Sequence, residues 1–311
     1  MNDSKMQIFS CEASQYLAER ISQHYGQPLS AIKVTRFSDG EFQPVILESV
    51  RGSIVYFVQS TFPPADNLLE LLMMIDAAKR ASANYIVAVI PYFGLARQER
   101  KHKPRVSIGA KLAANLITVA GVDRIITMDL HAPQIQGFFD IPVDHLDSSA
   151  VFLPYLEAQD LSNVVFVSPD FGGVHRVRLY AHHFVKDMII CDKYRKKANE
   201  IAHIRVMGDV SGKDVIIIDD MVDTANTLCK VATILKEQGA KSVRAMCTHP
   251  VLSGDAYQKI VDSELTELIV CDTIPLKKEV DKIRILSVAD LFAKVIRRVH
   301  EHESISSLFV T

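Results

Sequence analysis

The sequence predicts an α/β protein with two mainly parallel sheets, each flanked by helices. Short apolar runs alternate with helical patterns along the 311 residues, as is typical of parallel sheets that are covered on both faces. The pattern occurs twice, and the length suits two domains of ordinary size. A polar cluster follows most of the apolar runs. Because ligands bind at the carboxyl ends of strands in open parallel sheets, we expect the functional residues in those clusters.

In the first half, three apolar runs are expected to be buried strands: Ser53–Val58, Tyr85–Ile90 and Arg124–Met128. Two helices are expected between them. The first covers Ala65–Ser82 and is rich in Leu, Met and Ala. The second covers Ile108–Ala120 and is followed by Gly121, a residue that commonly ends a helix.

The second half repeats this arrangement. Five strands are expected there: Val164–Val167, Met188–Cys191, Val215–Ile218, Val243–Cys247 and Leu268–Val270. A helix is expected over Thr224–Gln238, before Gly239. We expect the division near Leu146–Val151, with one domain over residues 1–147 and the other over residues 148–299.

Composition excludes several classes of protein. The formal net charge is -2, whereas a general nucleic-acid binder usually carries a large basic excess. The five cysteines are far apart and form no Cys-x-x-Cys pair, so we expect reduced thiols in a cytoplasmic protein. The polar N-terminus is unlike a signal peptide, and no apolar run is long enough to span a membrane.

The segment from Val215 to Thr227 carries the clearest chemistry. Four aliphatic residues lead into Asp219 and Asp220, and a short polar loop then opens a helix. Backbone N–H groups at a helix start, together with the hydroxyls of Thr224 and Thr227, can hold a phosphate. The paired acids can accept hydrogen bonds from ribose hydroxyls. The alternative is an ordinary helix N-cap at Asp223 or Thr224, and the paired acids favour the ligand site.

Two clusters in the first half suit a nucleotide. Asp39-Gly40 is a hairpin-turn signal, Phe37 offers an aromatic face, and Glu41 adds a second carboxylate. The segment Arg97–Lys101 supplies the positive charge that a polyphosphate needs. A plain turn and a solvated basic loop are the respective alternatives.

Three more strand ends carry polar side chains. His131, near Asp129, is of a type that binds a divalent ion or a phosphate. Asp170 stands in a glycine-rich turn and can hold Mg²⁺ through water. Lys193 and Arg195 follow an apolar strand in a basic stretch with little helical or strand pattern, and they share one face if that stretch is extended. Two such cations can neutralise a transferring phosphoryl group, although a charged surface loop is the alternative.

Taken in order, these segments resemble the ribose-phosphate diphosphokinase family from near the N-terminus to the end of the chain, including Ser304–Phe309. The resemblance implies two tandem phosphoribosyltransferase-like domains, with the tail at about residues 300–311 packing back on the first. It also implies transfer of the diphosphate of Mg-ATP to ribose 5-phosphate. Homohexamers built from dimers are expected, and so is regulation by phosphate or ADP near Glu48–Gly52 and Lys79–Ala83.

The same resemblance implies roles for individual residues. Catalysis falls to Lys193 and Arg195, and the metal positions for Mg²⁺ are His131 and Asp170. Binding of ATP falls to Phe37, Asp39, Gly40, Glu41, Arg97 and Gln98, the first four serving a neighbouring subunit. Binding of ribose 5-phosphate falls to Arg195, Asp219, Asp220, Asp223, Thr224, Ala225, Asn226 and Thr227.

One position departs from the family, which usually has Gly where this chain has Asn226. If that position needs a left-handed backbone, Asn is the next most tolerant residue, and Val there should be far worse. Two other functions stay open. A phosphoribosyltransferase leaves the first half unexplained. An inactive regulatory homologue has only Asn226 in its favour.

Overall fold

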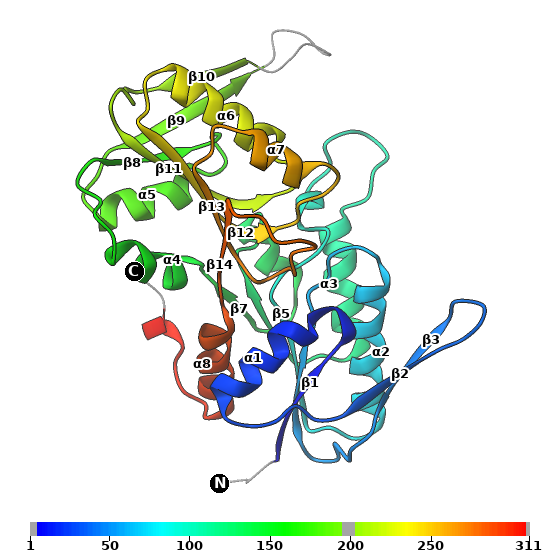
Figure 1. Ribbon diagram of the computed structural model, residues 1–311. Coiled ribbons are helices and arrows are strands. Elements are labelled where there is room, and N and C mark those ends of the chain that lie inside the picture. Colours follow the sequence, from blue (N-terminus) through cyan, green and yellow to red (C-terminus); the bar gives the residue numbers. More distant parts are fainter. Residues whose placement is uncertain (1–4, 195–202, 309–311) are drawn as a thin grey trace. The chain divides into compact units, whose positions relative to one another are not determined.

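The computed structural model describes residues 5–194 and 203–308. The chain divides into two compact units, one of Met1–Ser148 with Val288–Thr311 and the other of Ser149–Ser287 (Figure 1). The chain therefore returns to unit 1 at Val288, earlier than the boundary near residue 300 that the family resemblance implied. No helix of the described residues is long and apolar enough to cross a membrane.

Unit 1 is built on a parallel sheet of order β1-β4-β5-β6-β7. The strands are β1 (Met6–Ser10), β4 (Ile54–Val58), β5 (Tyr85–Ile90), β6 (Arg124–Met128) and β7 (Val143–Leu146). Helices α2 (Asp66–Arg80) and α3 (Gly109–Ala120) share one apolar cluster with alternate strand residues such as Phe57 and Ala88. The mainly parallel sheet that the sequence predicts is thus confirmed for this unit.

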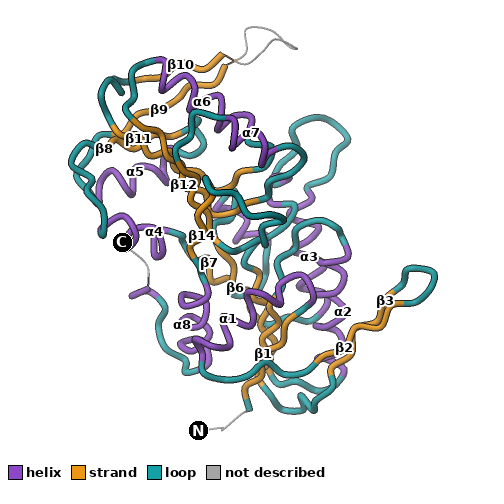
Figure 2. The backbone as a smooth tube through the Cα atoms, in the orientation of Figure 1, coloured by secondary structure: helices purple, strands orange, loops and turns teal. Residues whose placement is uncertain are grey.

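The end of the chain packs within unit 1. Helix α8 (Ala289–His300) lies against α1 (Gln15–Tyr25) (Figures 1 and 2). The guanidinium of Arg297 sits 4.5 Å from the centre of the Tyr25 ring, and it also donates to the Tyr25 carbonyl oxygen. Phe292, Val295 and Ile296 on α8 are buried, so apolar packing and a cation–π contact hold this helix in unit 1.

A separate hairpin leaves the body of unit 1. Strands β2 (Ile32–Arg36) and β3 (Phe42–Ile46) pair with each other as an antiparallel two-stranded sheet. The hairpin projects outward, as Figure 1 shows. An isolated two-stranded hairpin is marginally stable in water. The contact of β3 with α2 therefore matters for keeping its base in place.

Unit 2 has a seven-stranded sheet of order β10-β9-β8-β11-β12-β13-β14. Its strands are β8 (Val164–Ser168), β9 (Met188–Tyr194), β10 (His203–Met207), β11 (Asp214–Val222), β12 (Ser242–Pro250), β13 (Glu267–Cys271) and β14 (Ile283–Leu286), and its helices are α4 (Ser149–Glu157), α5 (Val174–His183), α6 (Asn226–Glu237) and α7 (Ala256–Asp262). Only β10 runs antiparallel to its neighbour. The expected mainly parallel sheet is confirmed here too.

The structure corrects the prediction for the basic stretch after Cys191. Strand β9 continues to Tyr194, and Lys193 pairs with Ile204 of β10. The predicted strand stopped at Cys191 because charged residues follow it. Antiparallel strands at the edge of a sheet can contain charged residues, since one face of such strands can remain in water.

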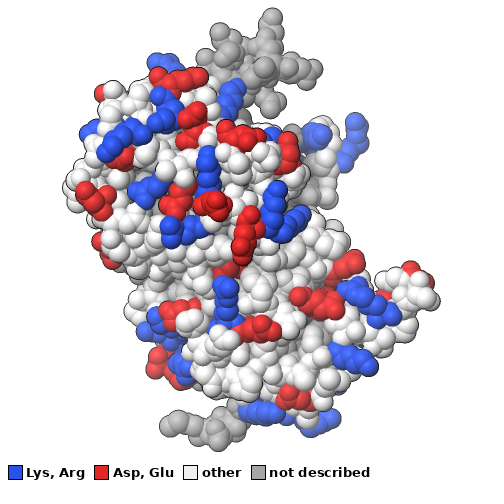
Figure 3. All heavy atoms as spheres, in the orientation of Figure 1, with Lys and Arg blue, Asp and Glu red and all other residues white. Residues whose placement is uncertain are grey.

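Charge is mixed on one face of the molecule. On the face drawn in Figure 3, basic and acidic side chains are interspersed. This agrees with the formal net charge of -2 and shows no broad field of one sign on that face.

Candidate functional site

The strand order of unit 2 reverses between β8 and β11. From β8 the chain passes through α5 to β9 on one side, and from β11 it passes through α6 to β12 on the other. Strands β8 and β11 are parallel neighbours, with Ile217 opposite Val167. Such a switch point leaves a crevice at the carboxyl ends of the two strands, where ligands bind in open α/β sheets. The predicted residues Asp170, Asp219 and Asp223 all lie in this region.

The turn after β8 is held by Asp170. The Gly173 N–H donates to Asp170 Oδ1 at 3.1 Å, and the Ser168 hydroxyl donates to the Asp170 carbonyl oxygen at 2.6 Å. A Cβ at Gly173 would lie 3.0 Å from Ser168 Oγ, so the turn leaves little room for a side chain there. The Asp170 residue is exposed, which presents its carboxylate at the strand end.

The paired acids belong to β11 itself. The Asp220 N–H donates to Asp219 Oδ1 at 2.9 Å. Asp220 is buried, and its Oδ1 lies 3.8 Å from Nη1 of Arg176 on α5. Burial raises the pKa of Asp219 well above its usual range, and the neighbouring charge of Asp220 raises it further, while Arg176 opposes both effects. The folded chain therefore holds these carboxylates at an electrostatic cost.

A tight turn joins β11 to α6. The Ser253 hydroxyl donates to Asp223 Oδ1, and the Ser253 N–H donates to the Asp223 carbonyl oxygen at 3.1 Å. Ala225 caps the helix with φ 59° and ψ 0°, and the Cys229 N–H donates to its carbonyl oxygen at 2.9 Å. The first N–H groups of a helix have no intrahelical acceptor. Those of α6 therefore point toward the crevice end, where an anion is favoured.

The expectation for Asn226 is wrong in one respect. The left-handed residue of the turn is Ala225, whereas Asn226 is the first residue of α6 and does not have positive φ. Asn226 and Thr224 are exposed and Thr227 is half-buried. Asn at 226 therefore needs no left-handed tolerance, because the residue before it carries the strained conformation.

The predicted nucleotide residues of the hairpin lie at its tip in unit 1. All four residues, Phe37, Asp39, Gly40 and Glu41, are exposed. The exposed fraction of Phe37 is 49%. The Phe37 N–H donates to the Glu41 carbonyl oxygen at 2.8 Å, and the Gly40 N–H donates to Phe37 at 3.1 Å. The Glu41 N–H donates to Asp39 Oδ1 at 3.0 Å. Gly40 has φ 97°, so the turn requires a glycine there.

The other predicted residues of unit 1 follow β5 and β6. Arg97 and Gln98 form the short 3₁₀ turn η2 (Ala96–Gln98), and both are exposed. A Cβ on Gly109 would come within 2.5 Å of Gln98 Oε1, so the bare glycine at the start of α3 makes room for Gln98. His131 is exposed and follows Leu130, whose N–H donates to Nε2 of His145 at 2.9 Å.

Some predicted residues fall outside this description. Arg195 lies outside the described residues, and of Lys193 only the main chain in β9 is described. Within residues 5–194 and 203–308, no group of three or more His, Cys, Asp or Glu side chains is arranged to hold a metal ion. The metal positions His131 and Asp170 belong to different units.

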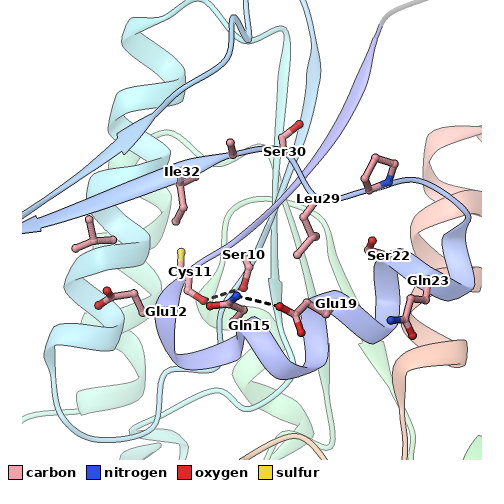
Figure 4. Close-up of a pocket in the computed structure, with 13 residues that line it drawn as sticks. Ser10, Cys11, Glu12, Gln15, Glu19, Ser22, Gln23, Leu29, Ser30 and Ile32 are labelled. Atoms are coloured by element: carbon pink, nitrogen blue, oxygen red, sulfur yellow. Dashed lines mark hydrogen bonds between the residues drawn. The ribbon is translucent and has the colours of Figure 1, made fainter.

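Unit 1 also contains a cavity of about 560 Å³ between α1 and β2, drawn in Figure 4. Its lining residues include none of the predicted site residues. Several of its polar side chains are already paired: the Gln15 amide donates to Glu19, and the Ser22 hydroxyl donates to the Gln27 carbonyl oxygen. We do not assign this cavity to the chemistry of the strand ends.

No sequence pattern pointed to three residues that shape these sites. They are Arg176, which pairs with Asp220, Ser253, which bonds Asp223 thirty residues before it, and His145 on β7, which bonds Leu130. A lone polar residue carries no motif, whether it lies in a helix, a strand or a loop, and only the fold brings each one to its partner.

Known proteins resemble this chain over nearly its whole length. Residues 6–121 match the family model described as the N-terminal domain of ribose phosphate pyrophosphokinase, and residues 165–310 match the phosphoribosyl synthetase-associated domain. The ribose-phosphate pyrophosphokinase of Porphyromonas gingivalis is 55% identical, covering 99% of each chain. That of Wolinella succinogenes is 56% identical over 97% of this chain and 98% of its own.

A solved structure is also similar. The phosphoribosylpyrophosphate synthetase of Mycobacterium smegmatis superimposes with a TM-score of 0.91 at 37% identity, covering 96% of this chain and 100% of that one. The agreement extends over both units, so the arrangement of strands and helices described above is that of a known enzyme fold.

The turn at Ala225 leads to a prediction that separates neighbouring positions. Ala225→Gly should retain stability or raise it by up to about 1 kcal/mol, because Gly enters the left-handed region freely. Ala225→Val should lower stability by about 2 kcal/mol or more, whereas Asn226→Val should cost under about 1 kcal/mol in a helical position. Urea unfolding of the three variants measures this. An equal loss for the two Val variants would contradict the backbone assignment.

The raised pKa of Asp219 leads to a second prediction. Its folded-state pKa exceeds the unfolded value, so the ionised carboxylate destabilises the fold above that folded pKa and the effect fades as the pH falls. Asp219→Asn should therefore raise Tm at about pH 8, with the gain shrinking toward about pH 4. Thermal unfolding in chelator without substrates measures the difference. Asp187→Asn, at an exposed position, is the control. An equal gain in Tm in both variants would contradict the raised pKa of Asp219.

Proposed function

We propose, since the chain belongs to the ribose-phosphate pyrophosphokinase family, that it transfers the diphosphate of Mg-ATP to the C1 hydroxyl of ribose 5-phosphate. The products are 5-phosphoribosyl 1-diphosphate and AMP. The observation that carries this proposal is the arrangement at the switch point of unit 2. There the paired carboxylates of β11 stand three residues before a tight turn that opens α6.

The spacing of this arrangement suits one phosphorylated sugar. Asp219 and Asp220 accept hydrogen bonds from ribose hydroxyls, while the backbone N–H groups of the turn from Asp223 to Thr227 hold the 5-phosphate. Both features lie at one strand end, so one ligand reaches them together. The ion pair that Asp220 makes with Arg176 keeps a negative acceptor there despite burial.

The reaction needs alignment and charge stabilisation more than covalent catalysis. The C1 hydroxyl oxygen forms a bond to the β-phosphorus and loses its proton to water, as the bond between that phosphorus and the α–β bridging oxygen breaks. AMP then leaves with the bridging oxygen. Lys193 and Arg195 are assigned the role of neutralising the charge on the transferring group. Lys193 lies in β9, which neighbours β8, whereas Arg195 lies outside the described residues.

The nucleotide is assigned to unit 1. Arg97 and Gln98 contact ATP, and Phe37, Asp39 and Glu41 hold the adenosine bound at a neighbouring subunit's site. The exposure of the hairpin tip supports the second assignment, since an aromatic ring that is half exposed and two carboxylates stand ready for a partner. This sharing of residues requires at least a dimer, and the family resemblance implies dimers assembled into hexamers.

Mg²⁺ is assigned to His131 and Asp170. An exposed carboxylate is a ligand that Mg²⁺ prefers, and imidazole also binds divalent ions, so the donor set fits. When bound, the ion would offset the negative charge of the phosphates. Within unit 2, the Asp170 turn lies on one side of the switch point and the α6 turn on the other, so these two turns would orient the ribose.

Regulation by phosphate or ADP is assigned to a place in unit 1 where two predicted segments meet. Arg51 Nη1 donates to Ser82 Oγ at 3.2 Å, and the Gly52 N–H donates to the Ser82 carbonyl oxygen at 2.9 Å. The guanidinium is exposed, and an exposed guanidinium suits an anion.

A labelling experiment tests the reaction against its alternatives. With ATP labelled at the β-phosphorus and ribose 5-phosphate, the label should appear on the ribose product and AMP should accumulate. Transfer of the γ-phosphate alone would leave the label in ADP. A phosphoribosyltransferase would release no AMP, and an inactive regulatory homologue would change nothing.

Lys193 provides a prediction on turnover. Lys193→Ala should lower kcat by about 10²-fold or more while the Kd for ATP changes little, because the charge acts mainly in the transition state. Single-turnover kinetics and equilibrium nucleotide binding measure the two effects. Lys213→Ala, at an exposed position of the same unit, is the control. Loss of binding and turnover in equal measure would refute the role.

Sharing of the hairpin between subunits provides another prediction. Asp39→Ala chains and Lys193→Ala chains should each be nearly inactive, yet mixed oligomers should regain activity, because some sites then combine two intact contributions. Activity is measured after joint refolding, with the mixed oligomers isolated by two affinity tags. No recovery in verified mixtures would mean that each site is built from one chain.

A further inference from the structure

Arg176 is a charged residue of the switch point to which no motif assigns a role. We propose that Arg176 is a positioning residue for the ribose-binding acids: its guanidinium attracts Asp220 and keeps the Asp219–Asp220 pair turned toward the ribose hydroxyls. This inference rests on the proposed function of the β11 acids. It concerns a residue that touches those acids and need not touch the substrate.

The location of Arg176 is set by packing. It lies in the first turn of α5, directly after the glycine turn that follows β8. Val177 and Tyr180 on the same helix are buried, and the Tyr180 ring lies 6.1 Å from that of Phe166 on β8. The Cβ position of Gly173 is 3.9 Å from the Ile218 carbonyl oxygen. The start of α5 is therefore fixed against both strands of the switch point.

The contact has the geometry of a charge interaction. Arg176 Nη1 and Asp220 Oδ1 are 3.8 Å apart, beyond the distance of a good N–H···O bond. The side chain of Asp220 is only 7% exposed and that of Arg176 20%, so water screens the attraction weakly. Arg176 thus acts on this carboxylate oxygen through its charge.

The acids need such a cation. The charges of Asp220 and Asp170 both act on Asp219 at this strand end, and like charges held close repel or take up a proton. A protonated or displaced carboxyl is a poorer acceptor for a ribose hydroxyl. Arginine keeps its charge at every accessible pH, so it fixes the ionised form of its neighbour without titrating itself.

Steady-state kinetics of three variants test the role. Arg176→Gln should raise the KM for ribose 5-phosphate about tenfold or more, while the KM for ATP stays within about threefold. Arg176→Lys should recover most of the loss, because at 3.8 Å a point charge replaces the fork. The exposed Arg178→Gln on the same helix is the matched control and should behave as wild type. An unchanged ribose 5-phosphate KM in Arg176→Gln would overturn the proposal, and so would equal increases in both KM values.

A double-mutant cycle separates positioning from folding. If Arg176 acts through Asp220, Arg176→Gln/Asp220→Asn should bind ribose 5-phosphate no more weakly than Asp220→Asn alone, as measured by calorimetry. Additive losses would overturn the proposal, because Arg176 would then act independently of that acid. Thermal unfolding identifies any variant that is not folded. If Arg176→Gln is not folded, the ribose 5-phosphate KM of Arg176→Lys decides whether Arg176 positions the acids. Calorimetry also keeps the two claims apart: wild type that binds ribose 5-phosphate but makes no AMP refutes the proposed reaction, while the cycle still judges Arg176.

Discussion

The parallel pairing of β8 with β11 is the constraint on which unit 2 depends. Because the two strands run side by side and their crossover helices leave in opposite directions, the loops that follow them open onto one crevice. The Asp170 turn comes from the first loop and the Ala225 turn from the second. Paired acids, glycine turn and helix start thus meet although about fifty residues separate them in the sequence.

The paired carboxylates of β11 repel each other at the place where the ribose is proposed to bind. Carboxylates that accept hydrogen bonds from a sugar must stay ionised, yet burial and mutual repulsion raise the pKa of Asp219. The Arg176 contact offsets part of this cost locally, whereas the left-handed backbone at Ala225 adds strain of its own. The apolar residues that precede these acids on β11, such as Ile216 and Ile217, are almost fully buried. Their burial stabilises the fold against the free-energy cost of the site.

Sequence patterns predicted much of the fold, and failed where tertiary contacts decide. The buried strands at 85–90 and 124–128 and the helices near α2, α3 and α6 followed from apolar periodicity. The β9–β10 hairpin was missed because charged edge strands lack that signal. Asn226 departs from the family pattern, and a left-handed backbone was therefore considered at that position. The structure has it one residue earlier, at Ala225. Sequence patterns do not locate a single positive φ to within one residue. Arg176 was missed because its partner Asp220 is on another element.

Amide hydrogen exchange measures the central claim most directly, namely that the start of α6 binds the 5-phosphate. Ribose 5-phosphate should slow exchange of the backbone N–H groups from Thr224 to Leu228, whereas ribose without its phosphate should leave them unchanged, since only the phosphate accepts from those donors. Inorganic phosphate should give weaker protection of the same groups. If ribose 5-phosphate protected other segments and left this turn unaffected, the sugar phosphate would bind elsewhere and the assignment of unit 2 would be wrong.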